Sequence, residues 1–213
     1  CQLKFPQTEF LMLSNGRALA NTAYRNAFLD ALPSHFRLAV PLYASTSDIH
    51  DTITRAHGSF EQTMTALKVL QHKVSVEVRI VVMKNTYKRL PEIANYLVSN
   101  LPNIKTVSIM GIELLGNAAL NREKLWVDFR NTTIYIEDAV HILLAGGIDT
   151  RIYNYPLCVL PRSLWSISAR SITNYKIRYP EECNGCAVRS LCGGFFFSTL
   201  HFENIQVSPI VEE

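Results

Sequence analysis

Short apolar runs alternate with amphipathic stretches along most of this chain. Five runs combine the length of a β-strand with a high content of apolar residues. They are residues 9–14, 36–43, 74–83, 106–111 and 148–154. The runs at 36–43 and 74–83 are largely apolar, which is typical of strands in a sheet that is covered on both faces.

Helical periodicity fills the intervals between these runs. Apolar residues recur every three or four positions over 20–31, over 58–71, after Pro91 and over 132–145. Pro91 suits the first turn of its helix, and a glycine pair ends the last one. Because helices connect successive strands, neighbouring strands should run parallel. The pattern predicts the α/β class, as either a β/α barrel or a doubly wound sheet.

The loops that follow the strands are polar and contain glycine. In parallel barrels, functional residues gather on these loops. They cover residues 15–17, 44–48, 84–86 and 111–113. Their composition fits a ligand-binding rim, although well-formed loops without a ligand have a similar composition.

Two charged residues interrupt the apolar strand at 74–83. Glu77 and Arg79 are two positions apart, so strand alternation places both on one face. Such a pair requires either a polar interior or ligand on that face, or an edge strand whose face is solvated.

His50 and Asp51 form a second polar pair, in a segment expected to be a loop. They resemble a metal-binding dyad, but a hydrolase site would need more converging histidines. We therefore favour a bracing role, in which Asp51 holds the His50 ring or caps a turn.

Composition narrows the possible classes of protein. The chain has 213 residues, of which 48% are apolar and 18% charged, so it can bury a core and is not disordered. Its net charge of +3 is too small to indicate a nucleic-acid or membrane partner. No targeting signal is visible, and no apolar run approaches the roughly 18 residues of a membrane span. We expect a cytoplasmic protein, in which thiols stay reduced.

Cysteines are concentrated near the C-terminal end. Cys183, Cys186 and Cys192 follow the spacing C-x2-C-x5-C before two glycines, and Cys158 lies farther upstream. Four thiolates match an iron–sulfur cluster or a structural zinc ion. The single C-x2-C pair favours the cluster, because zinc sites commonly use two such pairs. Zinc with His201 as fourth ligand, and buried free thiols, remain alternatives.

Several segments together resemble the radical SAM superfamily. LMLSNGR (11–17), the segment 41–70, VEVRIVVMKN (76–85) and VSIMGIELLG (107–116) are similar to the third to sixth barrel strands of that family and their loops. YNYPLC (153–158) and CAVRSLCGGFF (186–196) resemble the radical SAM maturase of the His-Xaa-Ser system.

This resemblance implies a partial (β/α)6 TIM-like radical SAM barrel over residues 1–154, with strands 3–6 present. A cysteine-rich iron–sulfur extension would cover residues 155–213. The C-x3-C-x2-C loop of the family and its Gly-Gly-Glu-Pro-like motif do not occur in the sequence, and Cys1 cannot supply the loop. We therefore expect a fragment that lacks two N-terminal strands and is inactive alone, with no catalytic residue of its own.

The resemblance also implies cofactors and partners. The intact enzyme would cleave S-adenosylmethionine reductively at a 4Fe-4S cluster and abstract hydrogen from a peptide. Contacts to S-adenosylmethionine would come from Asn15, Ser45, Arg79 and Gly111, although Pro41-Leu42-Tyr43 stands where many members have a serine. The four clustered residues Cys158, Cys183, Cys186 and Cys192 would hold an auxiliary 4Fe-4S cluster.

Expected partners are a peptide substrate such as a His-Xaa-Ser repeat protein, a second radical SAM maturase, and a reductant such as ferredoxin or flavodoxin. The alternative function is a zinc-stabilised, non-catalytic binding module.

Overall fold

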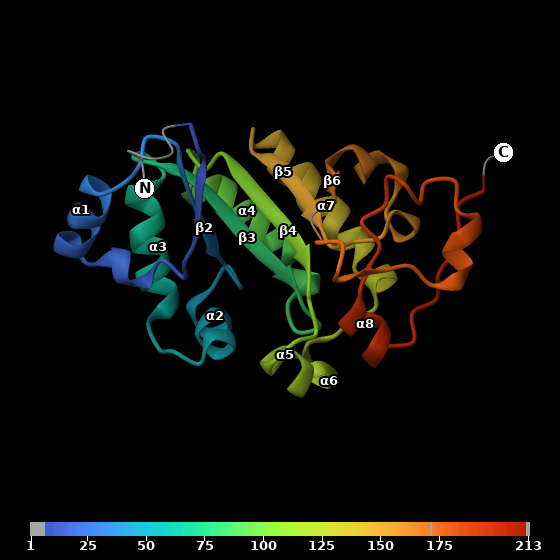
Figure 1. Ribbon diagram of the computed structural model, residues 1–213. Coiled ribbons are helices and arrows are strands. Elements are labelled where there is room, and N and C mark those ends of the chain that lie inside the picture. Colours follow the sequence, from blue (N-terminus) through green and yellow to red (C-terminus); the bar gives the residue numbers. More distant parts are fainter. Residues whose placement is uncertain (1–6, 171, 212–213) are drawn as a thin grey trace. The chain divides into compact units, whose positions relative to one another are not determined.

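The computed structural model describes residues 7–170 and 172–211, and it has the predicted α/β architecture (Figure 1). Six parallel strands form one sheet in the order β1-β2-β3-β4-β5-β6. They are β1 (Phe10–Leu13), β2 (Phe36–Pro41), β3 (Ser75–Val82), β4 (Thr106–Gly111), β5 (Asp149–Tyr153) and β6 (Ser168–Ala169). A separate antiparallel pair consists of β7 (Ile177–Arg178) and β8 (Phe195–Phe196).

Helices occupy most of the intervals between the strands of the sheet. The α-helices are α1 (Thr22–Asp30), α2 (Ser47–Thr54), α3 (Ser59–Leu70), α4 (Leu90–Asn100), α5 (Asn117–Leu120), α6 (Arg122–Leu125), α7 (Thr133–Ala145) and α8 (Phe197–Phe202). Short 3-10 helices are η1 (Arg17–Ala20), η2 (Tyr87–Arg89), η3 (Phe129–Asn131), η4 (Leu157–Val159), η5 (Arg162–Ile167) and η6 (Glu181–Gly185).

The chain divides into two compact units. Unit 1 contains residues 1–80, 92–107 and 142–149, and unit 2 contains residues 81–91, 108–141 and 150–213. The cysteine-rich segment is therefore in the same unit as the chain from 108 to 141. The predicted division at residue 154 stays a prediction. Cys1 lies outside the described residues.

All five predicted strands and all four predicted helices are confirmed, with ends that differ by a few residues. The parallel pairing is also confirmed: Leu38 of β2, for example, lies opposite both Met12 of β1 and Val76 of β3. The sequence pattern did not indicate the shorter elements, which are α2, α5, α6, α8, β6, β7 and β8. Each has eight residues or fewer, too few for a period to be recognised.

Unit 1 has its core between β2, β3 and the helices that follow them. One face of α3 is buried through Phe60, Met64 and Leu67, which lie about one turn apart. Leu38 and Val40 of β2 are fully buried. By contrast, β1 stands first in the strand order and leaves Leu11 and Leu13 52% and 63% exposed. The apolar surface of β1 is therefore uncovered in this structure.

The structure decides between the two explanations for Glu77 and Arg79. β3 lies between β2 and β4, so the edge-strand explanation is wrong. Glu77 is buried, and the Arg79 Nε donates to its Oε1 at 2.7 Å. An interior strand can contain these two charges because each neutralises the other at hydrogen-bond distance.

Unit 2 has an aromatic centre around Phe129. Its ring lies 4.9 Å from that of Tyr155 and 6.2 Å from that of Phe195, measured between centroids. The Tyr155 hydroxyl also shares a hydrogen bond of 2.9 Å with Thr132. Tyr155 lies close in sequence to Cys158, and Phe195 lies close to Cys192. This packing therefore fixes the backbone next to two predicted metal ligands. Among the described residues, no helix combines the length and apolar character needed to cross a membrane.

Packing of α4 gives a direct test of the unit 1 core. Leu97 is fully buried, so Leu97→Ala should leave a cavity and lower the free energy of unfolding by about 2–5 kcal/mol. Leu144→Ala is the matched control, because Leu144 is 46% exposed and should change stability by about 0.5 kcal/mol. Urea unfolding measures both, and equal effects would contradict this description of the core.

Candidate functional site

The four cysteines singled out from the sequence line one small pocket in unit 2. Cys183 belongs to η6 and Cys186 follows it directly, whereas Cys158 is in η4. Cys183 and Cys192 are buried, and Cys158 and Cys186 are half-buried. Other walls are Pro156, Tyr179, Val188, Arg189, Phe195 and the segment 207–209. The structure thus brings Cys158 to the three clustered thiols.

Tight turns shape the loop that contains three of these cysteines. The N–H of Cys186 donates to the carbonyl of Cys183 at 3.2 Å, and the N–H of Cys192 donates to that of Val188 at 3.0 Å. Gly194 then has a φ of +69°, and a Cβ there would come within 2.8 Å of the Ile177 side chain. Only glycine fits this position, which explains one glycine of the predicted pair.

Backbone N–H groups point at one of the sulfur atoms. Those of Leu157 and Gly194 both donate to Cys192 Sγ at 3.4 Å. Both donors therefore reach one sulfur, that of Cys192. Such donors stabilise a thiolate over a thiol, and the same contacts orient thiolates that ligate metals.

Burial, with repulsion from neighbouring thiolates, raises the pKa of two of these thiols, Cys183 and Cys158. Burial, followed by charge on the other three cysteines, raises the pKa of Cys183 to about 11, while Arg189 opposes the shift. Burial likewise raises the pKa of Cys158, against the opposing N–H of Ser208. A metal bound here would displace the protons and supply the positive charge that four adjacent thiolates require.

The four thiols line one pocket, but their sulfur atoms are not arranged to coordinate a metal ion. Within residues 7–170 and 172–211, no group of three or more His, Cys, Asp or Glu side chains is arranged to hold a metal ion. Ligation would therefore require the sulfur atoms to move. His201, the alternative fourth zinc ligand, is exposed on α8 and stacks on Phe197, and it does not line the pocket.

Three of the predicted S-adenosylmethionine contacts lie in unit 1. Asn15 follows β1, is exposed, and accepts a hydrogen bond from the N–H of Arg17 at 3.1 Å. Ser45 follows β2 and donates to Glu92 Oε1 at 2.5 Å. Arg79 is paired with Glu77 on β3. Their contact with S-adenosylmethionine stays a prediction.

Gly111, the fourth predicted contact, lies in unit 2 and has a structural reason to be glycine. It ends β4, and a Cβ at this position would lie 2.5 Å from the carbonyl oxygen of Asn154. Asn154 has a positive φ of 61°, and its Nδ2 donates to the Gly111 carbonyl at 3.4 Å. The ends of β4 and β5 thus approach each other too closely for any larger residue.

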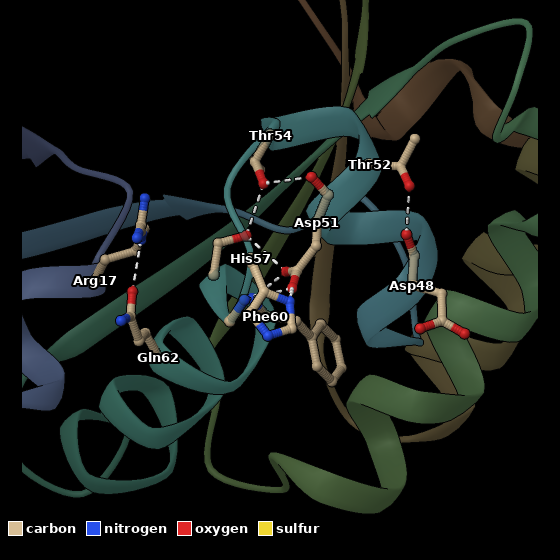
Figure 2. Close-up of polar contacts among 10 residues, drawn as sticks. Arg17, Asp48, Asp51, Thr52, Thr54, His57, Phe60 and Gln62 are labelled. Atoms are coloured by element: carbon tan, nitrogen blue, oxygen red, sulfur yellow. Dashed lines mark hydrogen bonds and ion pairs between the residues drawn. The ribbon is translucent and has the colours of Figure 1, made fainter.

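Asp51 caps a helix, as one of the bracing alternatives expected (Figure 2). Its carboxylate accepts hydrogen bonds from the N–H of Gly58 at 2.6 Å, the hydroxyl of Ser59 at 2.8 Å and the N–H of Phe60 at 2.8 Å. These donors belong to the first turn of α3, whose N–H groups have no partner within the helix. Asp51 therefore joins α2 to α3.

The expectation that His50 lies in a loop is wrong, because α2 contains it. His50 is buried, its Nδ1 accepts from the N–H of Tyr43 at 3.4 Å, and its ring packs on Phe60. Burial lowers the pKa of His50, so it is neutral at physiological pH. Its role is packing, and Asp51 does not hold its ring.

Sequence reasoning missed the C-terminal wall of the cysteine pocket. Residues 207–209 contain no cysteine, histidine or motif, so no sequence signal connects them with the thiols. No family model matches this chain, and no curated protein matches it.

The Asp51 cap makes a prediction about acid stability. Hydrogen bonding, above all from the N–H of Phe60, lowers the pKa of Asp51 below its ordinary 3.8. The cap thus stabilises the fold fully above pH 3.8 and loses its effect as pH falls through the lower folded-state pKa.

Asp51→Asn should therefore lower the urea midpoint most near neutral pH, and the difference from the unchanged protein should shrink in acid. Asp48→Asn, at an exposed position of the same helix, is the control and should have a smaller effect. A deficit for Asp51→Asn that is the same at every pH would contradict the cap.

The close approach at Gly111 gives a second test. Gly111→Ala should destabilise the protein by about 1–3 kcal/mol, because the backbone of Asn154 must move. Gly185→Ala is the control, since a Cβ there meets nothing within 4 Å. Thermal unfolding compares them, and an unchanged midpoint for Gly111→Ala would disprove the proposed steric constraint.

Proposed function

We propose that this chain is an iron–sulfur protein in which Cys158, Cys183, Cys186 and Cys192 hold a [4Fe-4S] cluster. The observation that supports the proposal is that one pocket is lined by all four thiols, although Cys158 comes from a different part of the sequence. Four thiolates are the complete ligand set of such a cluster.

The pocket residues fit a cluster chemically. Thiolate is the ligand type that iron–sulfur clusters require, and two backbone N–H groups are already directed at the Cys192 sulfur. Apolar walls from Pro156, Val188 and Phe195 would keep water away from the iron. When all four irons have a cysteine ligand, none is open to substrate, so the cluster would transfer electrons or stabilise the fold.

We further propose that the chain is part of a radical SAM maturase, in which this is the auxiliary cluster. The support is the resemblance of its motifs, the parallel α/β sheet, and the uncovered edge strand β1, which is what a partial barrel presents. In the intact enzyme, a second 4Fe-4S cluster would supply the electron that cleaves S-adenosylmethionine.

In that enzyme Asn15, Ser45, Arg79 and Gly111 would bind and orient S-adenosylmethionine. Its partners would be a peptide substrate, a second maturase and a reductant such as ferredoxin or flavodoxin. The resemblance implies that the peptide is a His-Xaa-Ser repeat protein.

Metal and sulfide analysis of the anaerobically prepared chain tests the cluster. About four iron and four acid-labile sulfide are expected per chain. Cys186→Ala should lower bound iron to about three per chain or fewer, because one iron loses its ligand. Cys1→Ala, at the fifth cysteine of the chain, is the control and should retain the iron.

Two results would overturn this assignment. One zinc per chain without sulfide would establish the zinc-stabilised binding module instead. Unchanged iron in Cys186→Ala would show that the iron is held elsewhere.

A further inference from the structure

A C-terminal segment closes one side of the cysteine pocket. Residues 206–210, here called the strap, follow α8 and contain no helix or strand. Val207, Ser208 and Pro209 line the pocket together with the four thiols. The strap therefore separates that side of the pocket from solvent, a role that nothing in its sequence indicated.

Side-chain and backbone contacts hold the strap at both ends. Arg130 of η3 donates from Nη2 to Ser208 Oγ at 2.8 Å and from Nη1 to Gln206 Oε1 at 3.3 Å. At the other end, the N–H of Ala187 donates to the carbonyl of Ile210 at 2.8 Å. Because Ala187 follows Cys186 directly, the second attachment ties the strap to the cysteine loop itself.

Arg130 is well placed to hold the strap because its own backbone is fixed. Its N–H donates to the carboxylate of Asp128 at 2.8 Å. The preceding residue, Phe129, is buried in the aromatic centre of unit 2. The guanidinium thus reaches the strap from a rigid base, and its planar shape allows two hydrogen bonds at once.

Ser208 connects Arg130 with Cys158, one of the proposed metal ligands. Arg130 binds the Ser208 side chain, and Ser208 lines the pocket together with Cys158. Since the strap has no secondary structure, its closure depends on a few such contacts, and losing two of them should raise the fraction of time it is open.

We infer that Arg130 is a positioning residue that keeps the strap closed over Cys158 and thereby restricts access of solvent and small solutes to the bound cluster. This inference rests on the cluster proposed above. Arg130 does not touch the cluster, so its effect appears in access to the iron and not in the amount of iron bound.

The test is the rate at which the full chain, prepared anaerobically with its cluster, loses iron to the ferrous chelator bathophenanthroline disulfonate. Arg130→Ala should bind as much iron and sulfide as the unchanged chain but release it about tenfold faster, because two hydrogen bonds to the strap are absent. Arg130→Lys should be intermediate, since lysine replaces the fork with a single donor group.

Two further variants separate this role from general destabilisation. Arg162→Ala removes another arginine of the same unit, which stacks on Trp165, and should release iron at the unchanged rate. The double variant Arg130→Ala/Ser208→Ala should be no faster than Arg130→Ala alone, because both changes break the same contact.

The outcomes are distinguishable from failure of the proposed function. Absence of iron and sulfide from the unchanged chain would overturn the cluster, and the inference with it. A normal cluster that Arg130→Ala releases at the unchanged rate would overturn only the role of Arg130. Equal acceleration in Arg162→Ala would do the same, because it would reflect loss of stability in the unit as a whole.

Discussion

The packing of Phe129 against Tyr155 and Phe195 is the interaction on which the cysteine pocket depends. The two partner rings lie just before Cys158 and just after Cys192, on segments that are far apart in the sequence. When both rings pack on Phe129, the two segments are fixed beside each other, and Leu157 can donate its N–H to the Cys192 sulfur across 35 positions of sequence. Burial of the aromatic rings thus holds together two segments that no local turn connects.

Bringing four thiols together is unfavourable for the protein without a metal. Burial and repulsion from the other thiolates raise the pKa of Cys183 to about 11, so this thiol keeps its proton near neutral pH. Backbone N–H groups lessen the repulsion but do not remove it. The cluster proposed above would neutralise the thiolates and join η4 to the cysteine loop.

Local patterns predicted most of unit 1 because its elements are long and periodic. The buried face of α3 and the apolar run of β3 each extend over several repeats, so their identity is readable before any contact is known. The sequence pattern did not predict features that depend on contacts between different elements. Glu77 and Arg79 share a face in any strand, but only the strand order shows that β3 is an interior strand. His50 belongs to a helix of eight residues whose position depends on Asp51 and the first turn of α3.

The alternation of strands and helices and the C-x2-C-x5-C spacing could be read from consecutive residues alone, because each is a local property. The parallel pairing followed from that alternation, because a helix that connects two strands lets them run in the same direction. Contacts between distant segments were needed to show that Cys158 shares a pocket with the other thiols, that Gly111 must admit the backbone of Asn154, and that Arg130 binds the strap. Ser208 and Arg130 are 78 positions apart, and contacts at such separations arise from the packing of whole elements, which no local spacing encodes.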